Sequence, residues 1–341
     1  MTERAATARA AGQGAAPRPW LVADVGGTNA RFGLVDDDGE VRHVEVVATA
    51  AYPEPAQAAA AYLAQRREAD PGWRAPRAAA FAVATAVERE PIALTNAGWT
   101  FTRAQLQAAL GVERLRVLND FEALALALPA LGPERLHVIG PWPPPPGARA
   151  VVGPGTGLGV GAVVPTALGW QAVPGEGGHA TLAAGDDFEA AVIAHARREF
   201  AHVSAERLLS GIGLPVLHRA VAAVEGRAAP ALDTPAIVQA ALDGGDALAQ
   251  RTLDAFCALL GSFAGNVALT FGARGGLYVG GGIVPRFAAR FAASRFRERF
   301  EAKGRFAPYL QAIPTPLVVD PLAALAGAAA SLQVPATDPQ G

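Results

Sequence analysis

A short unit of strand, glycine turn and strand occurs twice in this chain, and it restricts the possible folds more than any other feature. The first copy reads Asp-Val-Gly-Gly-Thr at residues 24–28, between apolar runs that predict strands at residues 21–25 and 31–35. The second copy reads Gly-Pro-Gly-Thr-Gly at residues 153–157 and also lies between two predicted strands. Because each half of the chain opens with the same unit, we expect an α/β protein with two similar domains and a ligand-binding cleft between them.

The length and composition of the chain agree with two domains. Its 341 residues exceed what one hydrophobic core usually organises, and the 51% of hydrophobic residues supply apolar surface for large cores. Pro and Gly at residues 129–132 mark the expected joint between the domains. The first 19 residues are rich in Ala, Arg, Gly and Gln and lack the apolar middle of a signal peptide, so we expect a disordered extension there.

Local signals place several elements. An apolar run predicts a strand at residues 78–83, and Thr102 with Gln105 forms a predicted capping box at the start of a helix. A short strand at residues 115–118 delivers two polar residues, Asn and Asp, directly after its C-terminal end. A closing helix is expected at residues 322–332.

Charge and cysteine usage exclude several classes of function. The formal net charge is -2, which argues against a nucleic-acid or membrane partner because both require a basic face. Cys257 is the only cysteine, so the chain forms no internal disulfide and offers no cysteine cluster to zinc. Its apolar neighbours predict a buried, inert thiol of the kind found in cytoplasmic proteins.

One uncharged stretch allows two interpretations. Residues 255–273 are long enough for a membrane span, and Gly261 and Gly265 have the spacing of small residues in packed membrane helices. The sequence lacks a second clear span and basic flanks. We therefore favour a buried core helix.

The two glycine turns are suited to phosphate. Glycine lets backbone N–H groups approach phosphate oxygens without interference from a Cβ atom, and Thr28 and Thr156 add hydroxyl donors. Asp24 supplies a carboxylate of the kind that a Mg²⁺–nucleotide needs nearby. Either turn alone is equally explained as a tight hairpin without a ligand. A threonine at the equivalent place in both turns favours phosphate binding.

Several known types of phosphate site are excluded because the chain lacks their motifs. Lys303 is the only lysine and is followed by Gly304, so it belongs to no Gly-Lys-Ser/Thr motif. P-loop and protein-kinase solutions both depend on a positioned lysine and are therefore excluded. Residues 155–159 also lack the helix and the acidic residue of a dinucleotide fingerprint. Backbone amides and Mg²⁺ are expected to hold the phosphates.

A second group of candidates is rich in carboxylates and amides: Asn119, Asp120, Glu176, His179 and Glu206. A sugar displays several hydroxyls that both donate and accept, so its site needs groups of these types. Phosphoryl transfer also needs a carboxylate near the attacking hydroxyl to take its proton. Asp120, at the end of a strand, is the best candidate for that base.

Other interpretations of these residues remain open at this point. In one interpretation Asp120 caps a helix that starts at Phe121, a role that is compatible with catalysis. Glu206, two residues after Ser204, fits an exposed helix start. His179 fits a satisfied core histidine or an isolated metal pair with Glu176.

Taken together, the motifs resemble those of the bacterial glucokinases of the hexokinase/actin-like ATPase superfamily. The run Leu-Val-Ala-Asp-Val-Gly-Gly-Thr-Asn-Ala-Arg at residues 21–31 is similar to the first phosphate motif of that family. Leu-Asn-Asp-Phe at residues 118–121 resembles its catalytic strand end, and Gly-Thr-Gly-Leu-Gly at residues 155–159 resembles its second phosphate motif. Similar blocks follow at residues 174–179, 202–207 and 276–287, so the resemblance covers the chain from residue 20 to about residue 327.

The resemblance implies a role for each matching residue. It makes Asp120 the general base on the sugar 6-hydroxyl and places Asp24 near Mg²⁺, through water. The implied glucose ligands are Asn119, Asp120, Glu176, His179 and Glu206. The implied ATP-binding residues are Ala23, Asp24, Val25, Gly26, Gly27, Thr28, Gly155, Thr156, Gly157, Gly159, Gly280 and Gly281.

The resemblance also implies the architecture and the setting. We expect two ribonuclease-H-like domains that close on the sugar: a small α/β domain formed by residues 20–129 and 320–341, and a large α/β domain formed by residues 130–319. Residues 1–19 form the extension. The implied protein is a cytoplasmic homodimer that phosphorylates glucose with ATP in the first step of glycolysis and has no nucleic-acid or membrane partner.

The sequence departs from the family in places, and two rival functions share some of its features. Residues 82–87 replace a Pro-containing segment, and the proline loop at residues 141–146 looks like an addition. The related ROK proteins carry a cysteine-rich zinc motif that a single cysteine cannot supply.

The rivals are a sugar-responsive regulator that has lost catalysis and an actin-like ATPase that needs no sugar.

Overall fold

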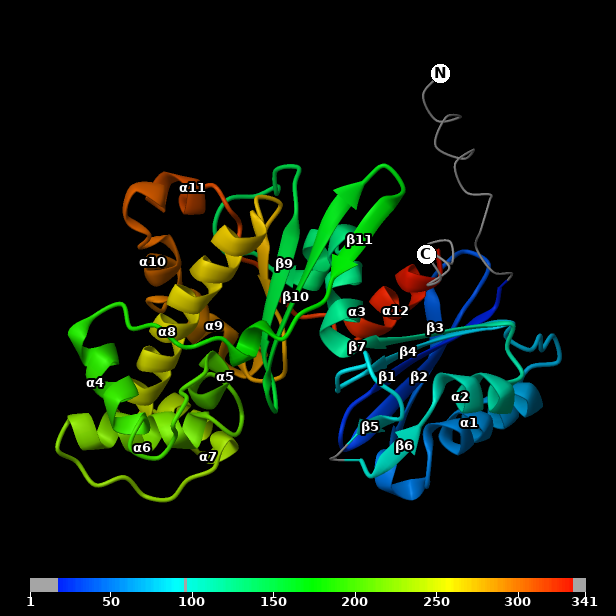
Figure 1. The fold of residues 1–341 in the computed structure, drawn as a ribbon, viewed down its shortest axis with the longest axis horizontal. Helices are drawn as coiled ribbons and strands as arrows, with labels where there is room; N and C mark the ends of the chain where they lie inside the picture. The colour runs from blue at the N-terminus through cyan, green and yellow to red at the C-terminus, as the bar shows by residue number, and fades with distance from the viewer. Residues whose placement is uncertain (1–17, 95–96, 334–341) are drawn as a thin grey trace. The chain divides into compact units, whose positions relative to one another are not determined.

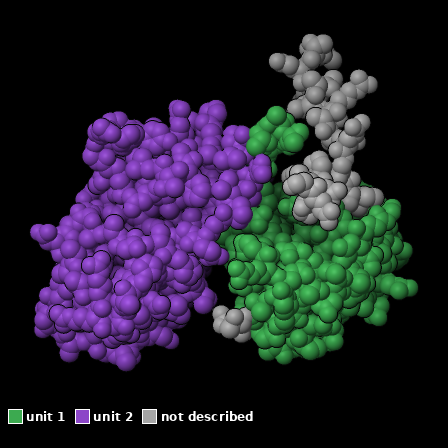
Figure 2. All heavy atoms as spheres, in the orientation of Figure 1, with its two compact units in different colours: residues 1–127, 166–170, 321–341 green, residues 128–165, 171–320 purple. Residues whose placement is uncertain are grey.

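The computed structural model describes residues 18–94 and 97–333. Contacts between residues divide the chain into two compact units, shown in Figure 2. Unit 1 comprises residues 1–127, 166–170 and 321–341, and unit 2 comprises residues 128–165 and 171–320. Most of the extension expected at residues 1–19, namely residues 1–17, lies outside the described residues.

Unit 1 contains a five-stranded sheet in the order β3-β2-β1-β4-β7 and a separate two-stranded sheet of β5 and β6 (Figure 1). Its strands and helices are β1 (Trp20–Val25), β2 (Asn29–Val35), β3 (Val41–Ala48), α1 (Pro55–Ala69), β4 (Ala78–Val83), β5 (Ile92–Leu94), β6 (Trp99–Phe101), α2 (Arg103–Leu110), β7 (Arg114–Asn119), α3 (Asp120–Ala127) and α12 (Ala323–Gln333).

Helices cover both faces of the five-stranded sheet in unit 1. Leu21, Ala23 and Val25 alternate along β1 and pack in one core with Tyr62 of α1 and Leu106 of α2. Helices α3 and α12 lie on the opposite face (Figure 1). Because both faces are buried, β4 is apolar without interruption, as the sequence predicts for residues 78–83, and Asp24 is the only polar residue of β1.

Two helices of unit 1 show how the sequence determines their placement. The predicted capping box is confirmed: Thr102 accepts the N–H of Gln105, and the Gln105 side chain accepts the N–H of Thr102, at the start of α2. Helix α12 packs closely on α3, because a Cβ atom at Gly327 would lie less than 3.0 Å from the carbonyl oxygen of Ala123. Only glycine allows this approach of the two backbones.

Unit 2 is built on a six-stranded sheet in the order β11-β10-β9-β12-β13-β8 (Figure 1). Its strands and helices are β8 (Leu136–His137), β9 (Arg149–Pro154), β10 (Leu158–Thr166), β11 (Gly169–Val173), α4 (Asp187–Ala196), α5 (Ala205–Leu208), α6 (Leu214–Val224), α7 (Thr234–Leu242), α8 (Ala247–Phe271), β12 (Leu277–Val279), α9 (Ala288–Ala292), α10 (Phe296–Glu301), α11 (Ala307–Gln311) and β13 (Leu317–Val318).

Helix α8 is long and apolar enough to cross a membrane by length and composition, but 83% of its most apolar window is buried inside the structure. A Cβ atom at Gly261 would lie less than 3.0 Å from the carbonyl oxygen of Phe296, and one at Gly265 would lie equally close to the carbonyl oxygen of Phe300. The two glycines therefore let α8 pack closely against α10. In this structure the spacing of the two glycines allows helix packing inside the protein core.

The only cysteine and the only lysine both belong to this packed region. Cys257 is 1% exposed, and burial raises the pKa of its thiol to about 12. The ammonium group of Lys303 donates to the carbonyl oxygen of Ser262 at 2.9 Å, and burial lowers its pKa. The predicted burial of the thiol is thus confirmed, and the lysine has a structural partner.

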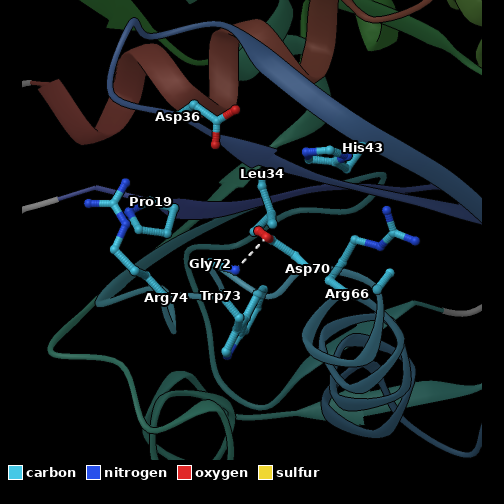
Figure 3. Close-up of a pocket in the computed structure, with 10 residues that line it drawn as sticks. Pro19, Leu34, Asp36, His43, Arg66, Asp70, Gly72, Trp73 and Arg74 are labelled. Atoms are coloured by element: carbon cyan, nitrogen blue, oxygen red, sulfur yellow. Dashed lines mark hydrogen bonds between the residues drawn. The ribbon is translucent and has the colours of Figure 1, made fainter.

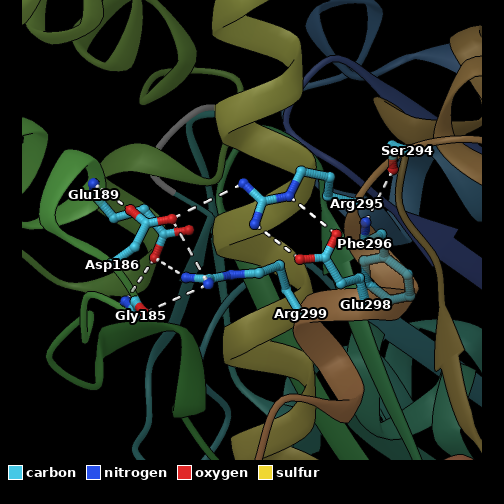
Figure 4. Close-up of polar contacts among 8 residues, drawn as sticks. All are labelled: Gly185, Asp186, Glu189, Ser294, Arg295, Phe296, Glu298 and Arg299. Carbon is cyan, nitrogen blue, oxygen red and sulfur yellow. Dashed lines mark hydrogen bonds and ion pairs between the residues drawn. The ribbon is translucent and has the colours of Figure 1, made fainter.

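A buried ion pair fixes the start of α4 to α10 in unit 2 (Figure 4). The Arg299 guanidinium lies 2.6 Å from the carboxylate of Glu189, and these side chains are only 8% and 2% exposed. The same carboxylate accepts the N–H of Gly185 at 2.6 Å. Hydrogen bonds of both side chains with the backbone of Gly185 partly offset the cost of removing these charges from water. The ion pair therefore fixes residues 185–189 to α10.

Candidate active site

The first glycine turn joins β1 to β2 in unit 1. The N–H of Gly26 donates to the carbonyl oxygen of Asn29 at 2.9 Å, which closes the turn. Thr49 supports it from outside, because its N–H donates to the oxygen of Thr28 at 2.9 Å and its hydroxyl donates to the oxygen of Gly27 at 3.1 Å. The carbonyl groups of Gly27 and Thr28 therefore point toward Thr49. Thr28 and Asn29 are exposed to solvent.

Asp24 is paired with Arg31, a residue for which the sequence motifs predict no role. Arg31 lies directly opposite Asp24 on β2, and its guanidinium is 3.0 Å from the Asp24 carboxylate. Burial nevertheless raises the pKa of Asp24 above its ordinary value, and the charge and hydrogen bond of Arg31 only partly offset that effect. The signal that identifies Arg31 is its position across the hairpin, because residues opposite each other in antiparallel strands interact.

Asn119 and Asp120 lie at the same edge of the sheet as this turn. In the parallel register Val25 pairs with Val83, and Val83 pairs with Asn119, so β1, β4 and β7 end at one level. Neighbouring strands are about 4.8 Å apart, which places Asn119 roughly 10 Å from the start of the turn. Unit 1 thus places Asn119, and Asp120 directly after it, at the same sheet edge as the first glycine turn.

Both residues also take part in the start of α3. The side-chain oxygen of Asn119 accepts the N–H of Phe121 at 2.8 Å, and its amide donates to the oxygen of Thr85 at 3.3 Å. The Asp120 carboxylate accepts the N–H of Phe121 at 3.0 Å. The helix begins at Asp120 rather than at Phe121, so Asn119 is its N-cap and Asp120 lies in the first turn, which corrects the capping role considered for Asp120.

The second glycine turn joins β9 to β10 in unit 2 and lies against a third glycine segment. The N–H of Gly155 donates to the oxygen of Gly157 at 2.9 Å. The N–H of Gly280 donates to the oxygen of Val152 at 2.8 Å. Gly281 has a φ of +79°, and a Cβ atom there would lie less than 3.0 Å from the oxygen of Pro154. The predicted residues at 155–159 and 280–281 are therefore neighbours.

The sugar block at residues 174–179 packs on the strand that follows the second turn. A Cβ atom at Gly178 would lie less than 3.0 Å from the oxygen of Leu158. This contact places His179 beside Glu206: its Nε2 atom is 3.6 Å from a Glu206 carboxylate oxygen, and its Nδ1 atom is 3.5 Å from Glu176. The predicted sugar ligands of unit 2 thus form one cluster, with Glu176 and His179 largely exposed.

Glu206 also bonds to the second glycine turn, a contact that its sequence position does not indicate. Its Oε2 atom accepts the N–H of Leu158 at 2.9 Å, while its other oxygen faces His179. Ser204 caps helix α5 by accepting the N–H of Arg207, so Glu206 does lie at a helix start, but its side chain is not exposed as that interpretation supposed.

We call the predicted residues of unit 1 the first half-site: Ala23, Asp24, Val25, Gly26, Gly27, Thr28, Asn119 and Asp120. Those of unit 2 form the second half-site: Gly155, Thr156, Gly157, Gly159, Glu176, His179, Glu206, Gly280 and Gly281. Each half-site joins a glycine turn to carboxylates. Among residues 18–94 and 97–333, no group of three or more His, Cys, Asp or Glu side chains is arranged to hold a metal ion.

A cavity of about 420 Å³ lies elsewhere in unit 1 (Figure 3). Its walls include Pro19 before β1, Asp36 after β2, Arg66 on α1 and Trp73. These residues lie at the end of β1 and β2 opposite to the glycine turn, roughly 17–20 Å away along the strand. None of the predicted site residues lines this cavity, so it is separate from the candidate active site.

Comparisons with known proteins point to one family. The family model described as Glucokinase matches residues 21–334. A glucokinase of Paramagnetospirillum magneticum is 47% identical over 322 residues, which cover 94% of this chain and 98% of that protein. A glucokinase of Chromobacterium violaceum is 45% identical over 329 residues, which cover 95% and 93%. The crystal structure of a glucokinase from an Antarctic psychrotroph is similar with a TM-score of 0.85 at 38% identity, covering 93% of this chain and 99% of that one.

Proposed function

Because this chain belongs to the glucokinase family, we propose that it is a kinase that transfers the γ-phosphoryl group of ATP to the 6-hydroxyl of glucose. One observation about the molecule supports this assignment most strongly. In unit 1 Asp120 directly follows β7, whose end lies at the same sheet edge as the glycine turn at residues 26–28. A base and a phosphate-binding turn are the two parts that phosphoryl transfer to a hydroxyl requires.

We assign the sugar to residues that offer both acceptors and donors. Glu176 and Glu206 accept hydrogen bonds from glucose hydroxyls, and His179 between them accepts or donates. Asn119 orients Asp120 through the start of α3 and offers a further polar group. Two ribonuclease-H-like domains closing on the sugar would exclude water and fix its 6-hydroxyl, and such positioning supplies much of the acceleration in phosphoryl transfer.

Asp120 acts as the general base in this proposal. Its carboxylate takes the proton of the 6-hydroxyl as the oxygen attacks the γ-phosphorus, the bond from that phosphorus to the bridging oxygen breaks, and ADP leaves. The proton transfer contributes about 10²–10⁴-fold to the rate.

The backbone of the two turns holds the phosphates, and Asp24 provides for the metal. Mg²⁺ in nucleotide sites keeps several waters and uses one or two carboxylates besides the phosphates, so a single partly buried aspartate fits it without a protein cage. When bound, Mg²⁺ neutralises phosphate charge. Arg31 holds the Asp24 carboxylate in a fixed position at the end of β1. We further propose a cytoplasmic homodimer without nucleic-acid or membrane partners.

An assay of ADP release from purified protein, with and without glucose, tests the function. We expect release to depend on glucose and to yield glucose 6-phosphate in equal amount. Release without sugar would indicate an ATPase, and glucose binding without release would indicate a regulator. The same assay with mannose, fructose and glucosamine, and with polyphosphate or ADP as donor, defines the specificity.

A further inference from the structure

We infer that Glu206 is shared between the two substrates, so that the sugar site and the second phosphate turn are coupled through one carboxylate. The inference rests on the proposed function, since it assigns glucose and ATP to these residues. It adds that Glu206 is a positioning residue for the nucleotide as well as a sugar ligand.

The two oxygens of Glu206 point to different parts of the second half-site. One accepts the N–H of Leu158, the residue directly after the turn, at 2.9 Å. The other lies 3.6 Å from the Nε2 atom of His179, inside the sugar cluster. The side chain is only 23% exposed, so it has little freedom to leave either partner. A shift of the carboxylate toward a sugar hydroxyl therefore acts directly on the start of β10.

The chain after Glu206 holds the turn a second time. The N–H of Gly211 donates to the oxygen of Gly155 at 2.7 Å, at the opposite end of the turn from Leu158. Helix α5 and its following loop thus contact both sides of residues 155–157 within six residues of sequence. A ligand that fixes Glu206 orders this segment and the turn together, and a ligand that orders the turn also fixes Glu206. Such coupling is reciprocal in binding free energy.

Gly157 provides a way to separate coupling from ordinary phosphate contact. A Cβ atom there would lie less than 3.0 Å from Oε2 of Glu206, whereas a Cβ atom at Gly155 meets nothing within 4 Å. Neither glycine has a positive φ, so alanine strains neither backbone. Both substitutions add one methyl group to the same turn. Only Gly157→Ala displaces the carboxylate.

The first arm of the test measures glucose affinity by calorimetry without nucleotide. We expect Gly157→Ala to weaken glucose binding by about tenfold or more, while Gly155→Ala binds glucose within about twofold of the parent protein. Equal glucose affinity of the two variants would overturn the inference. Thermal unfolding of both confirms that they are folded.

The second arm measures the affinity for the non-hydrolysable nucleotide AMPPNP with Mg²⁺ and without sugar. Glu206→Ala removes the acceptor of the Leu158 N–H, and we expect it to weaken AMPPNP binding about fivefold or more. Glu206→Gln keeps a carbonyl oxygen for that N–H and should retain the affinity. Glu176→Ala removes a sugar ligand that does not contact the turn, and it should also retain the affinity.

The two arms distinguish failure of the inference from failure of the proposed function. If Glu206→Ala and Glu176→Ala bind AMPPNP equally well, the carboxylate is not shared, although the protein is still a glucose kinase. If the parent protein binds no glucose, the proposed function fails, while the AMPPNP comparison still decides whether Glu206 positions the turn.

Discussion

The two half-sites use the same short motif but restrict it in different ways. In the first, a Cβ atom added at Gly26 would meet only the oxygen of Asn29, at an ordinary 3.5 Å. In the second, a Cβ atom at Gly157 or Gly281 would lie less than 3.0 Å from a neighbouring oxygen, and so would one at Gly178, which directly precedes His179. The first half-site therefore depends mainly on its charges, Asp24 and Asp120, and the second depends mainly on close packing of its backbone.

The largest effect should come from a change of charge in the first half-site. Asp120→Asn removes the proton acceptor but keeps the size of the side chain and an oxygen that can accept the Phe121 N–H. We expect kcat to fall by about 10²–10⁴-fold with little change in glucose affinity or stability. Steady-state kinetics and glucose calorimetry on the same preparation measure both. Near-normal turnover would remove Asp120 from the mechanism.

The next effect is steric and belongs to the second half-site. Gly178→Ala places a methyl group against the oxygen of Leu158, so β10 or the segment that bears His179 has to move. We expect a loss of about 3 kcal/mol in the free energy of unfolding and weaker glucose binding. Gly175→Ala is the matched control, since a Cβ atom there meets nothing within 4 Å. Urea unfolding that gives the same stability for both variants would contradict the close packing.

The smallest effect concerns the stability of the first half-site. The raised pKa of Asp24 means that the native state prefers its protonated form. The contribution of Asp24 to the free energy of unfolding is therefore largest below pH 3.8, the ordinary pKa of the group. It is lost as the pH rises through the native pKa, so the charged form of Asp24 costs stability at neutral pH. Asp24→Asn should therefore slightly raise the free energy of unfolding at pH 7, although it lowers activity.

This stability prediction is checked by urea unfolding at several pH values. The gain of Asp24→Asn over the parent protein should shrink as the pH falls toward 3.8. Arg31 loses its partner in this variant, but its side chain is 39% exposed and remains hydrated. A variant less stable than the parent protein at pH 7 would show that the ion pair outweighs the burial of Asp24.

Local sequence signals predicted the elements better than the contacts between them. The strand at residues 78–83 and the capping box of Thr102 were predicted correctly, because their causes lie within a few residues. The bond from Leu158 to Glu206 spans 48 residues and follows from how β10 and α5 pack, so no local pattern reveals it. Similarly, the sequence showed glycines at residues 177–178 but not the strand against which they pack.

The contact between Gly327 and Ala123 has a consequence for how the protein is made. These residues are roughly 200 positions apart, and the whole of unit 2 lies between them in the chain. A ribosome that adds about 5–20 residues per second needs on the order of 10–40 s to proceed from Ala123 to Gly327. Helix α3, which begins with Asp120, therefore lacks its packing partner α12 until almost the whole chain has been synthesised.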